Sequence, residues 1–391
     1  MEKDYQRRVP KLLRENLWAQ VTAPPEKSDN GVEKHVIGAD KVTGNLKVFV
    51  TGVNGQLGHD VVKELLKRGH VAIGSGSGHN YKGEDNLKKY ISGVGGLLGH
   101  DVVNKMIQRG HEAVGSGIQE TYSGIADGSA INVAAYYVQL DITDREAVIR
   151  TIVDLKPDCI VHCAAWTAVD AAEDTENQEK VDCINHLGTH YIAEAAKVVD
   201  AKMVYISTDY VFDGHGERPW EPDDKCYAPL NVYGRSKLDG ELAVSCTLEK
   251  YFIVRIAWVF GFNGKNFIHT MLNVGGTHDT VRVVNDQIGT PTYTMDLARL
   301  LVDMIETEKY GYYHATNEGG YISWYDFAVE IYRQVGFETK VIPVTTAEYG
   351  LSKAVRPFNS RLNKDKLITA GFTPLPTWQD ALSRYLKEIE K

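Results

Sequence analysis

A tyrosine and a lysine four residues apart are the first candidates for chemistry in this chain. Tyr233 and Lys237 lie in the segment Asn-Val-Tyr-Gly-Arg-Ser-Lys, and this spacing places both side chains on one face of a helix. A phenol exchanges protons poorly at neutral pH because its pKa is about 10. A neighbouring ammonium group lowers that pKa toward the working range. The pair therefore predicts a proton donor, Tyr233, whose pKa is lowered by Lys237.

A hydroxyl group at the end of an apolar segment complements this pair. The sequence Tyr-Ile-Ser-Thr-Asp-Tyr-Val-Phe, which begins at Tyr205, predicts a buried strand followed by Thr208 and Asp209. In open sheets of parallel strands, ligands bind beyond the carboxyl ends of the strands. Thr208 would then lie where a substrate carbonyl sits, so the three side chains together predict a site that acts on a carbonyl group.

A glycine-rich turn of the kind that seats a dinucleotide occurs twice. The first copy contains Gly52, Gly55 and Gly58 and the second Gly93, Gly96 and Gly99, and residues 50–83 match residues 91–124 at 18 of 34 positions. Each copy follows a short apolar strand and opens a helix, which is the context in which the helix N-terminus holds a pyrophosphate. The Gly-x-x-Gly-x-x-Gly spacing indicates the short-chain reductase group and a nicotinamide cofactor.

The acidic residue that holds the ribose of NAD is missing after both copies. It is expected about 20 residues beyond the turn, but both copies end in Gly-Ser-Gly, at residues 74–76 and 115–117. Without a carboxylate there is no repulsion against a 2′-phosphate. The sequence therefore favours NADPH, and NADH remains admissible.

Only one copy can supply the first strand of such a sheet. Copy one keeps Thr51, Asn54 and Gln56, whereas copy two runs directly into the next strand and residues 140–142. We hypothesise that copy two is built into the sheet and that copy one is a displaced repeat with exposed apolar surface, a hazard for swapping or aggregation.

Alternating strands and helices predict an α/β fold, a Rossmann-type doubly wound parallel sheet with a smaller C-terminal α+β substrate lobe. The expected strands are Lys47–Thr51 or its rival Tyr90–Ser92, Ala113–Gly115, Tyr136–Leu140, Cys159–Cys163, Met203–Ser207 and Phe252–Ile256. The expected helices are His100–Arg109, Arg145–Leu155, Val181–Val198, Val232–Leu248 and, in the lobe, Thr294–Thr307 and Ser323–Val335. The expected domains are an N-terminal appendage (1–46), the duplicated first βα unit (47–89), the dinucleotide-binding domain (90–260) and the substrate lobe (261–391), from which some segments return to the dinucleotide-binding domain.

Composition limits the classes of function. The chain has 391 residues, 43% hydrophobic and 24% charged, and a net charge of −9 spread along its length, which argues against a nucleic-acid partner. Five cysteines without a CxxC spacing are typical of reduced thiols in a cytoplasmic protein. No apolar run approaches the ~20 residues of a membrane span. Residues 1–46 predict one helix, which is either a docking helix or a remnant of an upstream segment.

These motifs resemble the dTDP-4-dehydrorhamnose reductase family of extended short-chain dehydrogenases/reductases. The resemblance covers roughly residues 48–389, with one repeat copy in excess. The segments that carry it are Thr51–Gly58, His162–Asp170, Ser207–Asp213, Pro229–Gly234, Lys237, Ala257–Phe260, Asn266–Phe267, Asn285–Thr292 and Arg356–Arg361.

The resemblance implies hydride transfer from a nicotinamide to the C4 carbonyl of dTDP-4-dehydro-L-rhamnose. The implied catalytic residues are Tyr233, Lys237 and Thr208. The implied cofactor residues are Gly52, Gly55, Gln56, Leu57, Gly58, Gly93, Gly96, Leu97, Leu98, Gly99, Asp141, Ile142, Ala164, Ala165 and Trp166, together with Tyr233 and Lys237. The implied substrate residues are Thr208, Asp209, Trp258, Asn266, Arg356 and Arg361, of which the two arginines suit a diphosphate.

Two other functions remain open at this point. One is a non-catalytic nucleotide-binding regulatory subunit of the same fold, and the other is a different nucleotide-sugar reductase or epimerase. The sequence shows no clear metal-ligand set, and the resemblance allows a homodimer. The nucleotide-sugar substrate is the one partner that the motifs imply.

Overall fold

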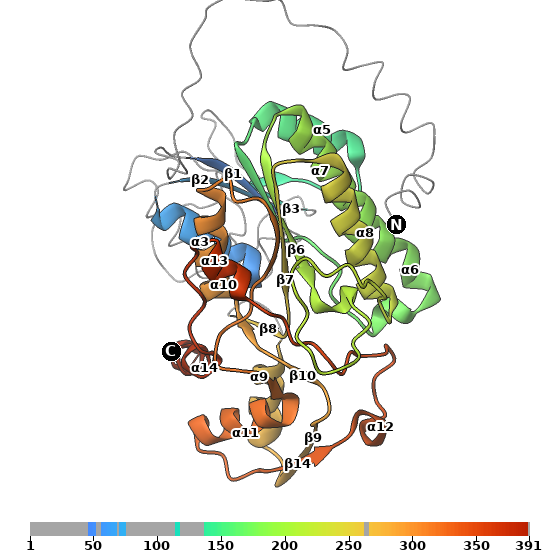
Figure 1. Cartoon of the computed structure of the whole chain (residues 1–391), viewed down its shortest axis with the longest axis vertical. Helices are drawn as coiled ribbons and strands as arrows, with labels where there is room; N and C mark the ends of the chain where they lie inside the picture. The colour runs from blue at the N-terminus through green and yellow to red at the C-terminus, as the bar shows by residue number, and fades with distance from the viewer. Residues whose placement is uncertain are drawn as a thin grey trace, which may run out of the picture.

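The protein is built around an eight-stranded, all-parallel sheet (Figure 1). The computed structural model describes residues 46–51, 56–68, 70–75, 114–117, 137–261 and 266–389. Across the sheet the order is β12-β7-β6-β5-β1-β2-β3-β4. Its strands are β1 (Lys47–Thr51), β2 (Val71–Ser75), β3 (Val114–Gly117), β4 (Tyr137–Gln139), β5 (Cys159–His162), β6 (Lys202–Thr208), β7 (Tyr251–Ile256) and β12 (Gly311–His314).

The strand order reverses between β1 and β5, which defines the crevice where such sheets bind ligands. The strands are short and nearly continuous in apolar residues because both faces of the sheet are covered. Val48, Phe49 and Val50 of β1 are each 0% exposed. The doubly wound fold predicted from the sequence is confirmed.

Helices cover the two faces of the sheet as separate layers (Figure 1). One layer packs α3 (Gln56–Lys67), α10 (Thr294–Ile305) and α13 (Asp365–Thr369) over a core that includes Val50 and Leu301. The other packs α5 (Arg145–Leu155), α7 (Gly188–Val198) and α8 (Val232–Thr247) over Phe49 and Met203. The remaining helical segments on this side are η2 (Ala171–Glu173), α6 (Thr175–Asp182), η3 (Cys183–Leu187) and η4 (Asp209–Val211).

A smaller lobe lies below the carboxyl edge of the sheet in Figure 1. It has its own aromatic core, in which Phe260 stacks on Tyr293 with ring centres 5.1 Å apart. Its elements are β8 (Val259–Phe260), α9 (Phe267–Gly275), β9 (Thr280–Val284), β10 (Ile288–Gly289), β11 (Thr292–Tyr293), β13 (Ile322–Ser323), α11 (Trp324–Val335), β14 (Lys340–Val344), α12 (Thr346–Tyr349) and α14 (Trp378–Ile389). The chain returns from this lobe to the sheet at α10 and β12, since β12 pairs with β7.

Among the described residues, the elements predicted for the dinucleotide-binding half agree with the structure to within a few residues, except that β2 was not predicted and that one helix is divided. The helix expected over Val181–Val198 is divided into α6, the π-helix η3 and α7. A π-helix widens the backbone hydrogen bonds to i→i+5, and such bulges are frequent at functional sites. No periodicity in the sequence signals it.

The hypothesis about the repeat is wrong, because copy one, not copy two, supplies the first strand. β1 pairs in parallel with β5 on one side and with β2 on the other. The helix of copy one, α3, buries Leu57, Val61 and Leu65 in the core it shares with α10. The turn of copy two and the helix expected over His100–Arg109 lie outside the described residues. So does the helix predicted in the N-terminal appendage.

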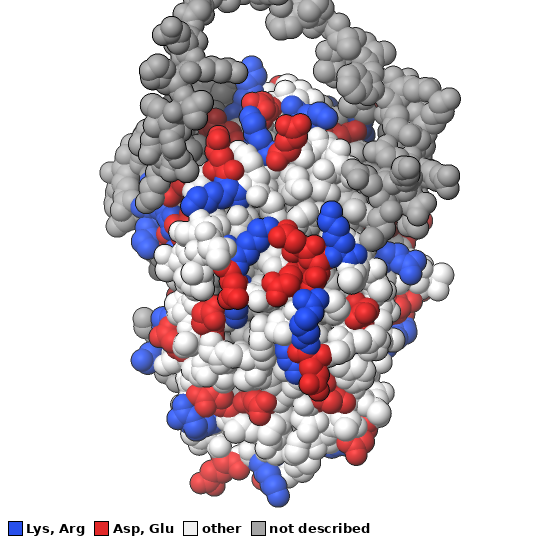
Figure 2. Space-filling view, in the orientation of Figure 1, with Lys and Arg blue, Asp and Glu red and all other residues white. Residues whose placement is uncertain are grey.

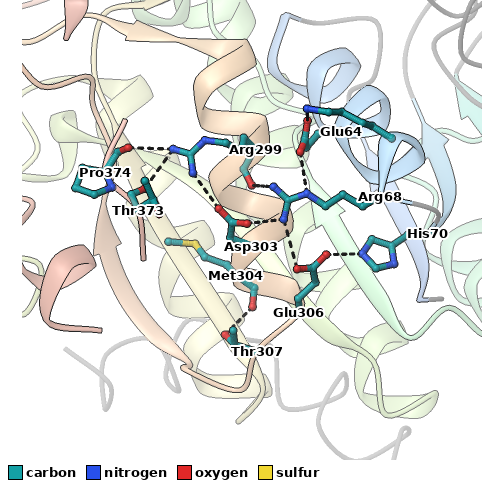
Figure 3. Close-up of polar contacts among 11 residues, drawn as sticks. Glu64, Arg68, His70, Arg299, Asp303, Met304, Glu306, Thr307, Thr373 and Pro374 are labelled. Carbon is teal, nitrogen blue, oxygen red and sulfur yellow. Dashed lines mark hydrogen bonds and ion pairs between the residues drawn. The ribbon is translucent and has the colours of Figure 1, made fainter. Parts of the chain in front are cut away.

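Polar contacts between α3 and α10 give the physical reason for this choice (Figure 3). Arg68 forms an ion pair with Asp303 and donates to the Arg299 carbonyl at 3.1 Å, and His70 Nε2 lies 2.7 Å from Glu306 Oε1. Within α3, Glu64 Oε1 lies 2.8 Å from Nε of Arg68 and holds it in place. Copy two retains the arginine and the histidine but has Lys105 in place of Glu64. Lys105 would repel the arginine that Glu64 attracts.

Copy two still contributes one strand. β3, whose residues belong to the second copy, pairs in parallel with β2 and with β4. Gly74 and Ser75 of the first copy therefore lie beside Gly115 and Ser116 of the second. The duplication adds a strand to the sheet.

The described surface carries charges of both signs. In Figure 2 acidic and basic side chains are interspersed over the visible face, and neither sign forms a continuous field there. None of the helices in this part of the chain combines the length and the apolar character that crossing a bilayer requires.

Candidate active site

The carboxyl end of β6 presents a short chain of hydrogen-bonded hydroxyl and carboxyl groups. Thr208 Oγ1 donates to Asp209 Oδ1 at 3.0 Å and accepts from the Tyr210 amide at 3.2 Å. Ser360, which follows Asn359 in the C-terminal segment, donates through Oγ to the other carboxylate oxygen, Asp209 Oδ2. Burial raises the pKa of Asp209 to about 6, although the hydrogen bonds from Ser360 and Thr208 lower it.

Helix α8 is held in a fixed position against this chain. Asn231 caps its first turn by accepting from the Gly234 amide at 2.7 Å, and Glu173 accepts from the Val232 amide at 2.8 Å. A Cβ on Gly234 would come within 2.3 Å of the Tyr210 carbonyl oxygen. Only glycine permits this approach, which brings Tyr233 beside Tyr210 with ring centres 5.6 Å apart.

The prediction that Lys237 lowers the pKa of Tyr233 is not what the structure shows. Burial raises the pKa of Tyr233 well above its ordinary value, the charge of Asp209 raises it further, and a hydrogen bond with Thr208 lowers it. Removal of a phenol from water outweighs a cation that does not contact it. Tyr233 is therefore a neutral phenol in this site, which is the form that can donate a proton.

The pKa of Lys237, unlike that of Tyr233, is lowered in this site. The side chain is 3% exposed, and its Nζ lies 4.1 Å from the centre of the Tyr205 ring. Burial lowers the pKa of Lys237 to about 7, whereas the nearby charge of Glu241 raises it. No carboxylate among the described residues forms an ion pair with it, because Glu241 is fully engaged by Arg255, with Oε2 2.8 Å from Nη2.

Besides Ser360, the structure adds Asn185, which the sequence reasoning missed. Asn185 of η3 is 0% exposed, accepts from the Trp166 amide at 2.8 Å and donates to the Trp166 carbonyl at 3.1 Å. Its Nδ2 also donates to Ser236 at 2.9 Å, and Ser236 donates to the Tyr233 carbonyl at 2.8 Å. Asn185 thus joins the end of β5 to the helix that carries the tyrosine and the lysine. The only signal in the sequence was an asparagine within a segment predicted to form a helix that packs on the sheet.

The switch point, where the strand order reverses between β1 and β5, is lined by small and hydroxyl-bearing side chains. Thr51 at the end of β1 accepts from the Ala164 amide at 3.2 Å and contacts Nδ1 of His162. His162 Nε2 lies 2.9 Å from Thr189 Oγ1. Burial first, and then the charge of Lys237, lower the pKa of His162 to about 3, so this histidine is neutral and structural.

The residues beyond the strand ends fit a nicotinamide dinucleotide. Ser207 Oγ is buried without a hydrogen-bond partner among the described residues, and Lys237 Nζ lies over the Tyr205 ring, 4.1 Å from its centre. Ribose hydroxyls would satisfy donors of this kind, and Ala164 leaves room above the end of β5. Asp141 lies at the end of β4, where its carboxylate accepts from Thr143, and Ile142 is buried against Gly188.

The structure shows how four of the predicted substrate residues are held, and their contact with substrate stays a prediction. Trp258 is held at a φ of 50°, in the left-handed region, and stacks on Trp324 with ring centres 3.8 Å apart. Arg356 donates to the Tyr210 hydroxyl at 3.1 Å and pairs with Asp170 at 2.6 Å. The other two are anchored locally, because Arg361 donates to Asn359, and Asn266 caps α9 and donates to Tyr385.

One group of three side chains has the donor types of a metal site. Asp182, His186 and Asp239 offer ligand atoms within 4.8 Å of one another. His186 Nδ1 already lies 3.1 Å from Asp182 Oδ1, and Asp182 is an exposed residue. An ordinary surface ion pair accounts for this group.

The sheet order, the switch point and the Thr208, Tyr233 and Lys237 arrangement define a short-chain dehydrogenase/reductase. Comparison with known proteins narrows this class. A family model described as the RmlD substrate binding domain matches residues 87–391. The matched range includes the second glycine turn and leaves out the first, although β1 comes from the first.

Individual relatives agree with the family model. The chain is 40% identical over 249 residues to the spore coat polysaccharide biosynthesis protein SpsK of Bacillus subtilis, covering 64% of this chain and 86% of that protein. It is also 40% identical over 250 residues to the dTDP-4-dehydrorhamnose reductase of Streptomyces griseus, covering 62% and 81%.

Solved structures of similar fold point to the same family. A dTDP-4-dehydrorhamnose reductase from Clostridium acetobutylicum has a TM-score of 0.70 at 35% identity, covering 88% of this chain and 100% of that one. The Bacillus anthracis enzyme in complex with NADP has a TM-score of 0.66 at 32% identity, with coverage of 88% and 100%. The chain therefore belongs to the RmlD family of dTDP-4-dehydrorhamnose reductases, and it is an oxidoreductase.

Proposed function

We propose that this chain uses NADPH to reduce the C4 keto group of dTDP-4-dehydro-L-rhamnose to dTDP-L-rhamnose. The observation that carries the proposal is a neutral phenol, Tyr233, hydrogen-bonded to Thr208 and one helical turn from a buried ammonium, Lys237. Three of the four relatives named above are called dTDP-4-dehydrorhamnose reductases, and the structure of one of them is a complex with NADP. The cofactor supplies the hydride.

The chain's own residues supply the proton and the orientation. Tyr233 donates its hydroxyl proton to the C4 oxygen, and Thr208 holds the same oxygen or the phenol. Lys237 binds ribose hydroxyls and, as a cation, stabilises the phenolate that remains. Asn185 keeps α8 at its distance from the end of β5 and acts as a positioning residue.

The substrate is proposed to lie between the sheet edge and the smaller lobe, residues 261–391. Trp258 shapes the sugar pocket with one face, because Trp324 covers the other. Arg356 and Arg361 are proposed to face the diphosphate. Arg356 would then share its guanidinium between phosphate, Asp170 and Tyr210, which couples substrate binding to the ring beside Tyr233.

The test is NADPH oxidation on addition of dTDP-4-dehydrorhamnose, followed for the native chain and for Tyr233→Phe. We expect kcat of the variant to fall roughly 10²–10⁴-fold, the usual contribution of a positioned proton donor. NADPH affinity should be unchanged. Tyr349→Phe, which alters an exposed tyrosine, is the matched control and should behave as native. A native chain that binds NADPH but never oxidises it would instead be a regulatory nucleotide-binding subunit.

A further inference from the structure

Asp209 is a buried carboxyl group with an unusual set of neighbours. It is 2% exposed, and two hydroxyl groups donate to its oxygens, Thr208 to Oδ1 and Ser360 to Oδ2, beside a hydrogen bond from its own backbone amide. A buried carboxylate is ordinarily stabilised by a paired cation. Here the site supplies hydroxyl groups instead, so the charged and neutral forms of Asp209 are close in free energy.

The charged and titratable groups around Asp209 come from three elements. Tyr210 lies in the same short helix, Tyr233 faces it from α8, and Arg356 faces it from the C-terminal segment. Arg356 is the only cation among them, and its charge is already compensated by Asp170 at 2.6 Å. The two phenols are neutral, so no neighbour holds Asp209 firmly in its ionised form.

The protonation state of Asp209 decides the direction of the hydrogen bonds. The Thr208 hydroxyl has one hydrogen to donate, and its oxygen already accepts a hydrogen bond from the Tyr210 amide. When Asp209 is ionised it can only accept, so the Thr208 hydrogen points to Asp209. Tyr233, which is hydrogen-bonded to Thr208, must then donate its own hydrogen to Thr208. That hydrogen is directed away from a substrate carbonyl.

Protonation of Asp209 reverses this chain. The carboxyl group then donates from Oδ1 to Thr208, whose hydrogen is free to turn to the Tyr233 oxygen. We propose that Asp209 is a positioning residue whose protonation turns the Thr208 hydroxyl toward Tyr233 and leaves the Tyr233 proton directed at the substrate. The same hydrogen bond stabilises the phenolate after the proton has left. This inference rests on the proposed function, because it assigns a pH dependence to that reduction.

The experiment is the pH profile of kcat between pH 5 and pH 9 for the native chain, Asp209→Asn and Ser360→Ala. For the native chain we expect kcat to fall about tenfold between pH 5 and pH 7, as expected for one group that titrates near 6. An amide donates to Thr208 at every pH, so Asp209→Asn should lose this fall. Ser360→Ala removes a hydrogen bond that stabilises ionised Asp209. In this variant the fall in kcat should therefore occur about one pH unit higher than in the native chain.

Asp200→Asn is the matched control. Asp200 lies at the opposite end of β6 and pairs with Lys250 at the surface, so its variant should keep the native profile. KM should change little in every variant, whereas a merely structural role of Asp209 would alter KM and kcat and leave the profile in place. The inference is overturned if the fall persists at the same pH in Asp209→Asn, or if Ser360→Ala does not move it upward.

Two further outcomes are decisive. If circular dichroism shows that Asp209→Asn does not fold, the Ser360→Ala profile alone decides the matter. If the native chain oxidises no NADPH at any pH, the proposed function fails and the inference fails with it. Oxidation with an unaltered profile in the variants overturns the inference alone.

Discussion

The catalytic edge of the sheet and the contact between α3 and α10 treat charged side chains in opposite ways. At the α3–α10 contact Arg68 pairs with both Asp303 and Glu306, as Figure 3 shows. At the catalytic edge, Lys237 is buried without an ion pair among the described residues, and Asp209 is buried among hydroxyl groups. The first contact stabilises the fold, whereas the second keeps groups ready for substrate at a cost in stability.

The largest expected effect comes from removal of the buried ammonium. Burial lowers the folded-state pKa of Lys237 to about 7, well below the ordinary value for a lysine. The unfolded chain therefore binds the proton more tightly, and the charged lysine destabilises the folded state. The penalty is fully present below pH 7 and disappears as the pH rises toward 10.5. Lys237→Met should raise the free energy of unfolding by up to about 4 kcal/mol at pH 6 and abolish turnover.

Denaturant unfolding of the cofactor-free protein at pH 6 and pH 9 measures this effect. The gain from Lys237→Met should be smaller at pH 9 than at pH 6. Lys250→Met, at a half-exposed lysine that pairs with Asp200 at the surface, is the control and should change stability little at either pH. A loss of stability in Lys237→Met at pH 6 would contradict the conclusion that the buried charge of Lys237 destabilises the folded protein.

The second prediction separates the two copies of the glycine turn. Because β1 of copy one lies at the switch point, Gly55→Val should weaken NADPH binding about 100-fold, since a side chain there blocks the pyrophosphate. Gly96→Val should leave the dissociation constant unchanged. Fluorescence titration with NADPH measures both. A loss confined to Gly96→Val would mean that copy two, which the family model includes, holds the cofactor.

The smallest effect is expected at the contact between α3 and α10, where the charged groups are paired. Glu306→Gln removes the charge that faces His70 and Arg68, and it should lower the free energy of unfolding by about 1–2 kcal/mol. KM and kcat should not change, because this contact lies in the layer of α3 and α10. Lys67→Gln is the control, since Lys67 is 72% exposed and its pair with Glu64 contributes little. An altered KM in Glu306→Gln would show that the two regions are coupled.

The predictability of the site differs from residue to residue. Tyr233 and Lys237 were recognisable from their helical spacing and Thr208 from its place at the end of an apolar strand, and the structure joins Thr208 and Tyr233 by a hydrogen bond. Asn185 and Ser360 were not recognisable as parts of the site. Asn185 depends on a π-helix, and Ser360 lies 151 residues from the carboxylate it contacts. Neither relationship leaves a local pattern.

The choice between the two glycine turns was mispredicted for a similar reason. Continuity along the chain favoured copy two, but the first strand is selected by what its helix packs against. Arg68 and His70 of copy one meet Asp303 and Glu306, more than 200 residues away. In addition, the pKa of Tyr233 was expected to fall, but burial, which sequence spacing does not reveal, raises it.

The amino-acid sequence by itself determined the class of fold, the cofactor type and the three residues proposed to react, because these depend on periodicity and on residue types at short spacing. Only the tertiary structure decided which repeat forms the first strand and how Asp209, Arg356 and Trp258 are held. Those features depend on contacts between segments far apart in the chain and on burial. Burial in turn sets whether Tyr233, Lys237 and Asp209 carry charge.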